Sequence, residues 1–142
     1  MDGFHFSEEV SVRFSETDAQ GIVNNAVYLN WFEVARVAYL ARFRGGYKGL
    51  IESGVEAVTL ETHVRYSAPC RFDDRLRIWT RVTEPERLRA RFRFEYLIER
   101  LNDPAGSVAD GWTSHATVDA ERLAPTRMPA WLADAIRAAE TG

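Results

Sequence analysis

The stretch Ser15–Arg36 reads SETDAQGIVNNAVYLNWFEVAR, and it places one carboxylate, that of Asp18, shortly ahead of an apolar helix pattern. From Tyr28 to about Arg44, aromatic and aliphatic residues recur at three- and four-residue steps, which is the period of an α-helix. A second apolar stripe adjoins the first, so we expect this helix to be covered on more than one side. The pair Gly45–Gly46 is expected to end it.

Outside this helix the chain alternates apolar and polar residues with a period of two, which predicts β-strands. One short strand is expected within residues 4–14, four more at about 58–68, 75–82, 88–98 and 107–119, and a closing helix at 129–140. This order predicts an α+β fold in a single domain over residues 1–142. A curved antiparallel sheet of about five strands would wrap the long helix.

The composition excludes several classes of protein. The chain has 142 residues with 46% apolar and 27% charged residues, which is typical of a globular protein. Its net charge of -3 gives no reason to expect a nucleic acid partner. The single cysteine, Cys70, cannot form an internal disulfide, and no metal-ligand cluster is evident. Without a secretory signal or an apolar run of about 20 residues, we expect a cytoplasmic protein that does not bind membranes.

Two interpretations of Asp18 follow from the residues alone. An Asp before a glycine-containing loop commonly forms an Asx-turn or caps a local bend. However, the first N–H groups of a helix are unpaired and carry partial positive charge, so they can stabilise the developing oxyanion of a thioester carbonyl. A carboxylate beside them could attack that carbonyl or deprotonate a water molecule that does.

The segment VRFSETDAQGIVNNAVYLNWFEVAR resembles the signature of the 4-hydroxybenzoyl-CoA thioesterase branch of the hot-dog-fold acyl-CoA thioesterases. The segments YSAPCRFDDRLRIWTRV and RFRFEYLI are similar to strands of the same family, so the resemblance covers nearly the whole chain. It implies a hot-dog fold and hydrolysis of an acyl-CoA to a free acid and coenzyme A. It also implies no cofactor, because coenzyme A enters with the substrate, and a homodimer or homotetramer whose sheets pair at their edges.

The resemblance also implies roles for particular residues. Asp18 takes the place of the catalytic carboxylate, and Asn25 supplies the backbone N–H that polarises the thioester carbonyl. Gly21 would let the chain approach the substrate closely. Glu33 matches a position that can be acidic near the acyl pocket, or it is a solvated or inter-subunit residue. Many relatives carry His where Ile22 stands, so any role of that imidazole is absent here.

The run ERLRARFRFE predicts four arginines on one face of a strand. This face is either simply solvated, or part of it binds the phosphates of coenzyme A, which arginine recognises well. We expect Arg89 and Arg91 to contribute to such binding. No stacking platform of aromatic residues is expected on that face, which argues against nucleic acid. Tyr28 either lines the acyl pocket or packs in the core.

Two other functions compete with the thioesterase. The first is a non-catalytic hot-dog module that binds acyl-CoA or a partner protein. The second is a hydratase or dehydratase of acyl chains, which normally needs a histidine to move protons. Ser15–Arg36 contains no histidine, so the sequence favours the thioesterase.

Overall fold

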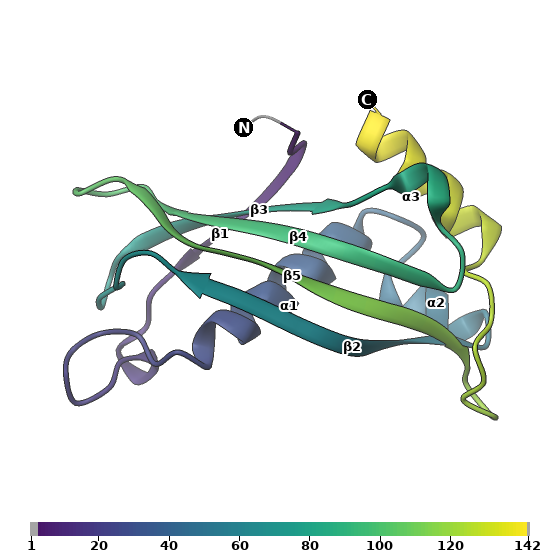
Figure 1. The fold of residues 1–142 in the computed structure, drawn as a ribbon, viewed down its shortest axis with the longest axis horizontal. Helices are drawn as coiled ribbons and strands as arrows, with labels where there is room; N and C mark the ends of the chain where they lie inside the picture. Colours follow the sequence, from purple (N-terminus) through teal and green to yellow (C-terminus); the bar gives the residue numbers. More distant parts are fainter. Residues whose placement is uncertain (1–2, 142) are drawn as a thin grey trace.

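The computed structural model describes residues 3–141, which form one curved antiparallel sheet around a long helix (Figure 1). The strand order is β1-β3-β4-β5-β2, with bounds β1 (Phe6–Ser11), β2 (Val55–Tyr66), β3 (Arg75–Val82), β4 (Arg91–Arg100) and β5 (Gly106–Asp119). The helices are α1 (Val27–Ala41), α2 (Tyr47–Glu52) and α3 (Ala130–Thr141), with short 3-10 turns η1 (Phe14–Glu16) and η2 (Pro85–Arg87). The predicted α+β class and the five-stranded wrap around one helix are confirmed.

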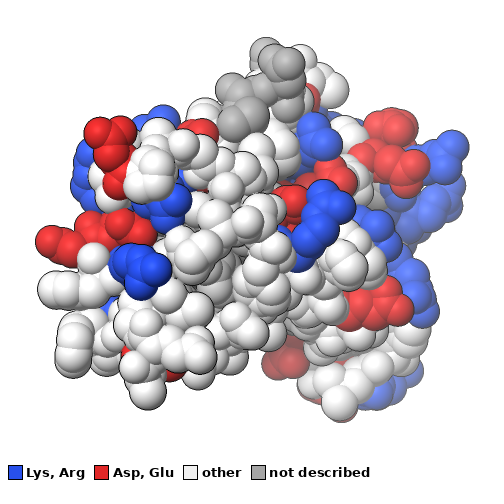
Figure 2. Space-filling view, turned by 60° about the vertical axis from the view of Figure 1, so that its left-hand side comes forward, with Lys and Arg blue, Asp and Glu red and all other residues white. Residues whose placement is uncertain are grey.

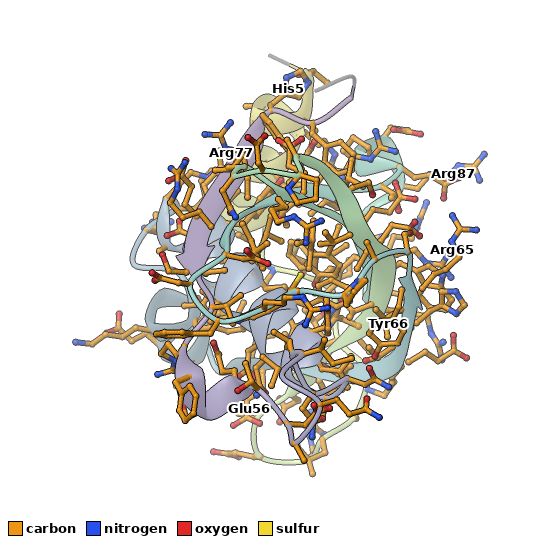
Figure 3. The ribbon with its side chains drawn as sticks, turned by 90° about the vertical axis from the view of Figure 1, so that its left-hand side faces the viewer. His5, Glu56, Arg65, Tyr66, Arg77 and Arg87 are labelled. Atoms are coloured by element: carbon orange, nitrogen blue, oxygen red, sulfur yellow. The ribbon has the colours of Figure 1, made fainter. Side chains whose placement is uncertain are left out.

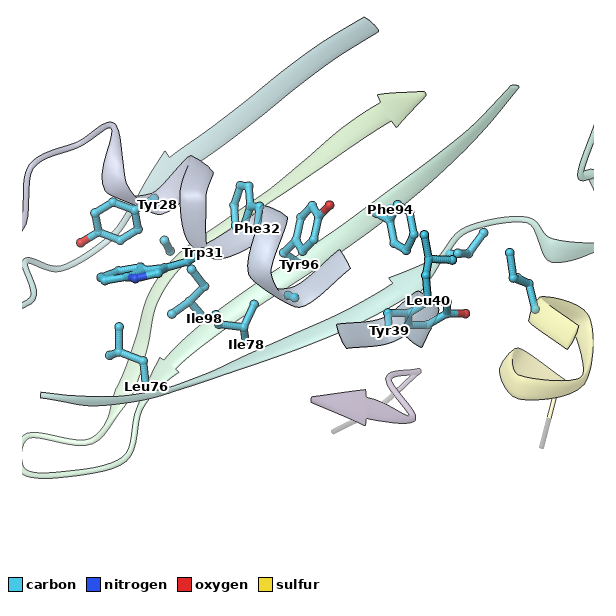
Figure 4. Packing of buried hydrophobic residues seen from close by; sticks show 14 of the residues in the cluster. Tyr28, Trp31, Phe32, Tyr39, Leu40, Leu76, Ile78, Phe94, Tyr96 and Ile98 are labelled. Carbon is cyan, nitrogen blue, oxygen red and sulfur yellow. The ribbon is translucent and has the colours of Figure 1, made fainter. Parts of the chain in front are cut away.

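The core lies between α1 and the concave face of the sheet (Figure 4). Phe32 and Tyr96 stack with their ring centroids 4.1 Å apart, and Tyr39 meets Phe94 edge to face at 5.3 Å. All four side chains are at most 2% exposed. Burial of large aromatic rings supplies much of the stability of such a core, so the apolar stripe of α1 fixes the helix on the sheet.

The ends of α1 differ slightly from the sequence prediction. The helix begins at Val27 and ends at Ala41, followed by a turn that closes at Gly46. Gly46 has a positive φ of 64°, and a Cβ there would lie 3.0 Å from the Ala41 backbone, so only glycine suits this position. Within residues 3–141, no helix is long and apolar enough to cross a membrane.

A β-bulge in β2 changes which side chains of that strand face α1. Thr59 pairs with His115, whereas Glu61, not Leu60, pairs with Ser114. Because Thr59 lies opposite the buried His115, it is on the concave face, and Val58 is on the outer face. The sequence predicted one uninterrupted alternation of inward and outward side chains over residues 58–68, and this prediction is wrong for the residues before the bulge. One inserted residue exchanges the side chains that point to the concave face with those that point to the outer face.

The predicted strand at 88–98 begins later than expected. Glu84 is in the left-handed region with φ 46°, and Pro85 then starts η2, which carries Arg87. Arg89 lies in the segment before β4, where its carbonyl accepts a hydrogen bond from the Met128 N–H. The prediction that four arginines share one strand face is wrong, because proline favours the turn over an extended strand.

The C-terminal helix is held to the core by Glu140. Its carboxylate accepts hydrogen bonds from the Tyr39 hydroxyl and from the Val82 N–H, the latter at 3.0 Å. Both donors belong to residues at most 2% exposed. Removing the carboxylate leaves two buried donors unpaired, so we expect Glu140→Ala to lower the free energy of unfolding by about 2–4 kcal/mol.

Urea unfolding measures this change, with Glu86→Ala as the control because Glu86 is exposed on η2. A loss no greater in Glu140→Ala than in Glu86→Ala would contradict this role of the carboxylate.

Candidate functional site

Asp18 lies in a compact hydrogen-bonded loop. The Asp18 N–H donates to the Ile22 carbonyl, and the Gly21 N–H donates to the Asp18 carbonyl, both at 2.9 Å. Its carboxylate accepts the Gln20 N–H at 2.8 Å, which is an Asx-turn. Gly21 has φ +79°, a conformation that favours glycine. The side chain of Asp18 is exposed, so its turn-forming role leaves the carboxylate accessible.

The start of α1 follows directly from this loop. The Asn24 N–H donates to the Glu16 carbonyl at 2.9 Å, which closes the loop at its base. The side-chain oxygen of Asn24 accepts a hydrogen bond from the Ala26 N–H at 2.9 Å, and the main-chain carbonyl of Asn24 accepts one from the Val27 N–H. Asn24 therefore shapes the turn that leads into the helix. Within residues 3–141, the Asn25 N–H has no hydrogen-bond acceptor. This free donor is available to a ligand.

Two contacts fix the loop and the helix start, one to the segment between β2 and β3 and one to the end of β2. The Val23 N–H donates to the Cys70 carbonyl at 2.9 Å, and the Tyr66 hydroxyl donates to the Asn25 carbonyl at 2.9 Å. Figure 3 views the molecule from this end, with Tyr66 on the inner side of the curved sheet and Arg65 pointing outward. The structure therefore places Asp18, Gly21 and Asn25 in one hydrogen-bonded segment at this end of the molecule.

The surface around this loop is partly apolar. Phe14 and Phe72 are 74% and 55% exposed, and their rings meet edge to face with centroids 5.7 Å apart. Figure 2 shows a broad uncharged area across the middle of the molecule, with charged groups gathered to either side of it. An acyl chain is apolar, so such a surface suits its entry.

Tyr28 packs in the core. It is 2% exposed, and its ring contacts Trp31 and Tyr66 with centroid distances of 5.0 and 4.9 Å. Burial, followed by the neighbouring Cys70 thiol, raises the pKa of Tyr28 above its usual range. Burial likewise raises the pKa of Cys70, so the thiol is protonated at neutral pH. Of the two interpretations of Tyr28, the structure supports packing, and it supports an unreactive Cys70.

The remaining predicted residues lie away from Asp18. Glu33 is exposed on α1, two turns beyond the helix start. Arg91 opens β4 at one end. Ile98, near the other end of β4, lies level with Tyr66 across β5, and Tyr66 contacts the start of α1 beside the Asp18 loop. Seven residues of strand span about 24 Å. Within one chain, Arg91 and Arg89 are therefore far from Asp18.

Arg91 lines a groove of about 740 Å³ on the outer side of the sheet, together with Arg87 and Arg93. Arg87 projects outward from this side in Figure 3. The guanidinium of Arg93 lies 3.7 Å from the ring centroid of Trp112, which comes from β5. The prediction that aromatic residues are missing from this face is wrong, because a neighbouring strand supplies one. The absence of a nucleic acid partner stays a prediction.

A polar network inside the sheet was missed by the sequence analysis. The Arg36 guanidinium donates to the Tyr96 hydroxyl at 3.2 Å, which is 2.7 Å from the Thr113 hydroxyl, and Thr113 is 2.7 Å from His115 Nε2. The sequence indicates this network only weakly. Its members are a single arginine in an otherwise mostly apolar helix and inward-facing residues of two strands, which no short motif connects. Within residues 3–141, no group of His, Cys, Asp and Glu side chains is placed to hold a metal ion.

Comparison with known proteins agrees with the fold. Residues 12–136 match the family described as the thioesterase-like superfamily. The chain is 31% identical to the acyl-CoA thioesterase YbgC of Haemophilus influenzae over 87% of this chain and 88% of that protein. It is 27% identical to the putative acyl-CoA thioesterase YneP of Bacillus subtilis over 83% of each chain.

Among solved structures, one similar chain is a thioesterase from Thermus thermophilus in complex with coenzyme A and zinc. The TM-score is 0.81 at 30% identity, covering 100% of this chain and 98% of that one. A 1,4-dihydroxy-2-naphthoyl-CoA thioesterase from Synechocystis shares the fold, with a TM-score of 0.83 at 22% identity over 93% of this chain and 95% of that one. The chain belongs to the thioesterase-like superfamily, which confirms the resemblance found in its sequence.

Proposed function

We propose that the protein hydrolyses acyl-CoA thioesters, with Asp18 as the catalytic carboxylate and the Asn25 N–H as the donor to the thioester carbonyl. One observation carries the assignment. An exposed carboxylate and an unpaired N–H at the start of a helix belong to the same hydrogen-bonded loop unit. In the reaction, the acyl carbon gains an oxygen from water and the carbon–sulfur bond breaks. Coenzyme A leaves as a thiolate and takes up a proton, and the acyl group leaves as a carboxylic acid.

The chemistry needs only these two groups. The Asn25 N–H and the partial positive charge of the helix start stabilise the oxyanion that forms as the carbonyl is attacked. The Asp18 carboxylate either attacks the carbonyl carbon, giving a mixed anhydride that water hydrolyses, or takes a proton from the attacking water. Both routes require the ionised carboxylate. A similar protein described as an acyl-CoA thioesterase and another in complex with coenzyme A support the substrate class.

Two copies would complete the site. Strand β2 is a 12-residue edge strand whose second half is mostly exposed, and such an edge favours pairing with another strand. If two β2 strands pair antiparallel, the Val55 end of one lies beside the Tyr66 end of the other. The Arg91 end of one copy then approaches Asp18 of the other and can bind the phosphates of coenzyme A.

Size-exclusion chromatography with light scattering measures this assembly. A homodimer or homotetramer is expected, and a monomer at micromolar concentration would contradict it.

Two predictions from the sequence stay predictions. Arg89 does not line the groove that holds Arg91, so its role in coenzyme A binding is one of them. The cytoplasmic location is the other.

Release of the coenzyme A thiol from a panel of acyl-CoAs tests the activity. The panel spans short, long and aromatic acyl groups. Turnover of at least one member at a rate well above spontaneous hydrolysis is expected. No turnover of any member would favour the non-catalytic binding module instead.

The proposed mechanism also predicts the effect of a chelator. Because the reaction uses a carboxylate and a backbone N–H, we expect excess EDTA to leave kcat unchanged. This experiment is informative because the Thermus thermophilus thioesterase was crystallised with zinc. Loss of activity on chelation, with recovery when zinc is restored, would show that the mechanism lacks an essential component.

A further inference from the structure

Arg36 is a half-buried cation without a counter-charge. It lies on α1, and its guanidinium donates to the Tyr96 hydroxyl at 3.2 Å and lies beside the Tyr47 side chain of α2. Its Nε is buried and has no hydrogen-bond partner in the described part of the chain. Among those residues, no carboxylate lies within ion-pair distance of it. Burial lowers the pKa of Arg36, but the neighbouring Tyr96 and Tyr47 side chains raise it by more, so the guanidinium stays charged although no anion is paired with it. An anion that reached this guanidinium would therefore be bound well.

The groups beyond Arg36 are uncharged at neutral pH. Burial raises the pKa of Tyr96 to about 12. Burial, with the positive charge of Arg36, lowers the pKa of His115 to about 4. Thr113 joins these two side chains through hydrogen bonds of 2.7 Å on each side. The network fixes the position of the guanidinium but does not neutralise it.

Arg36 lies on the side of α1 that faces β4 and β5. Its hydrogen bond to Tyr96 of β4, and through it to Thr113 of β5, sets this orientation. Leu29 and Glu33 precede Arg36 at helical spacing and share this flank of the helix. Leu29 is 40% exposed, and Glu33 is exposed too. This flank therefore runs from the proposed Asn25 donor to Arg36, and it is exposed at Leu29 and Glu33 and half-buried at Arg36.

We propose that the acyl group of the substrate runs along this flank and carries a carboxylate at its far end, which Arg36 binds. The substrate class is then the coenzyme A monothioester of a dicarboxylic acid. This inference rests on the proposed thioesterase function. Glu33 is the acid nearest in sequence on this flank and forms no ion pair in the described structure, so it leaves Arg36 free for the ligand.

The length of the flank sets the length of the acyl group. Eleven residue steps separate Asn25 from Arg36, and nearly all of them lie in α1, so at the helical rise they span about 16 Å. Helical side chains lean toward the N-terminus, which shortens the distance from the Asn25 N–H to the guanidinium by roughly one turn, about 5 Å. An extended chain advances about 1.2 Å per bond. A suberoyl group fits the remaining distance, and a succinyl group is too short.

Matched substrate pairs test the proposal, because members of a pair differ only in the terminal carboxylate. The pairs are succinyl- and butyryl-CoA, adipoyl- and hexanoyl-CoA, and suberoyl- and octanoyl-CoA. For the wild type, kcat/KM should favour the dicarboxylic member of the longest pair by about 30-fold or more. Arg36→Gln should abolish this preference, and Arg36→Lys should retain part of it. The ratio for each variant is independent of the fraction of correctly folded protein.

Arg42→Gln is the control, since it removes a positive charge from the region just after α1. Arg42 packs on the rings of Phe6 and Tyr39, away from this flank. The substrate ratio should be unchanged in Arg42→Gln. An equal loss of kcat/KM for both members of each pair in Arg36→Gln would overturn the proposal and leave Arg36 a purely structural role.

A binding measurement separates this inference from the thioesterase activity. Suberate should raise the thermal unfolding midpoint of the wild type more than octanoate does, and Arg36→Gln should remove the difference. If no acyl-CoA is hydrolysed, this comparison still tests Arg36, while the proposed activity fails by itself. Equal stabilisation by the two acids would overturn the carboxylate site even if acyl-CoAs are hydrolysed.

Discussion

Asp18→Asn should lower kcat for acyl-CoA hydrolysis by about 100-fold or more while leaving the fold intact. The variant separates the two interpretations of Asp18. An amide oxygen can accept the Gln20 N–H as the carboxylate does, so asparagine preserves the Asx-turn and the loop. It cannot act as a nucleophile or as a base. A residue that only forms the turn would therefore tolerate this change.

The measurement is thiol release under saturating substrate, with the thermal unfolding midpoint of each variant recorded alongside. Asp73→Asn serves as the control, because Asp73 is an exposed aspartate in another loop. Asp73→Asn should retain the wild-type kcat. If Asp18→Asn also retained it, the catalytic group would have to be another residue, and Asp18 would be only a turn former.

His115 should make the protein less stable in mild acid. Its side chain is 2% exposed, and burial, followed by the charge of Arg36, lowers its pKa from 6.5 to about 4 in the folded state. As the pH falls below 6.5, the unfolded chain takes up a proton that the folded protein does not bind. Stability is therefore complete above this pH and is lost progressively down to about pH 4. The total loss is about 3 kcal/mol.

Urea unfolding between about pH 7.5 and about pH 4.5 measures this dependence. His115→Gln should have a flatter profile across this range than the wild type, whatever its stability at neutral pH. His63→Gln is the control, because His63 is exposed on β2, and its profile should follow that of the wild type. Parallel profiles for His115→Gln and the wild type would show that another group titrates on unfolding.

The sequence was most informative where local chemistry decides the structure. The apolar period of α1 depends on neighbours in the chain, and the structure has this helix close to where it was predicted. Strand β3 agrees with its predicted bounds, Arg75–Val82. In each case the residue type itself restricts the backbone or defines the buried face.

The features that the sequence did not predict depend on distant contacts. The bulge in β2 changes which side chains face α1, but no glycine in the strand indicates its position. Its position is set by the pairing of β2 with β5. Trp112 joins the arginine face only because β5 lies beside β4. Arg36, Tyr96 and His115 come from three elements, and no short pattern links them. Hydrophobic periodicity describes only neighbouring residues in the chain, so it does not reveal contacts between distant strands and helices.

The most direct test of the proposed site is a crystal structure of Asp18→Asn with an unhydrolysed acyl-CoA bound. The mechanism predicts the thioester carbonyl oxygen at about 3 Å from the Asn25 nitrogen. It also predicts the side chain at position 18 beside the carbonyl carbon, on the side from which an oxygen nucleophile would attack. A thioester bound elsewhere, such as in the outer groove beside Arg91, would contradict the account.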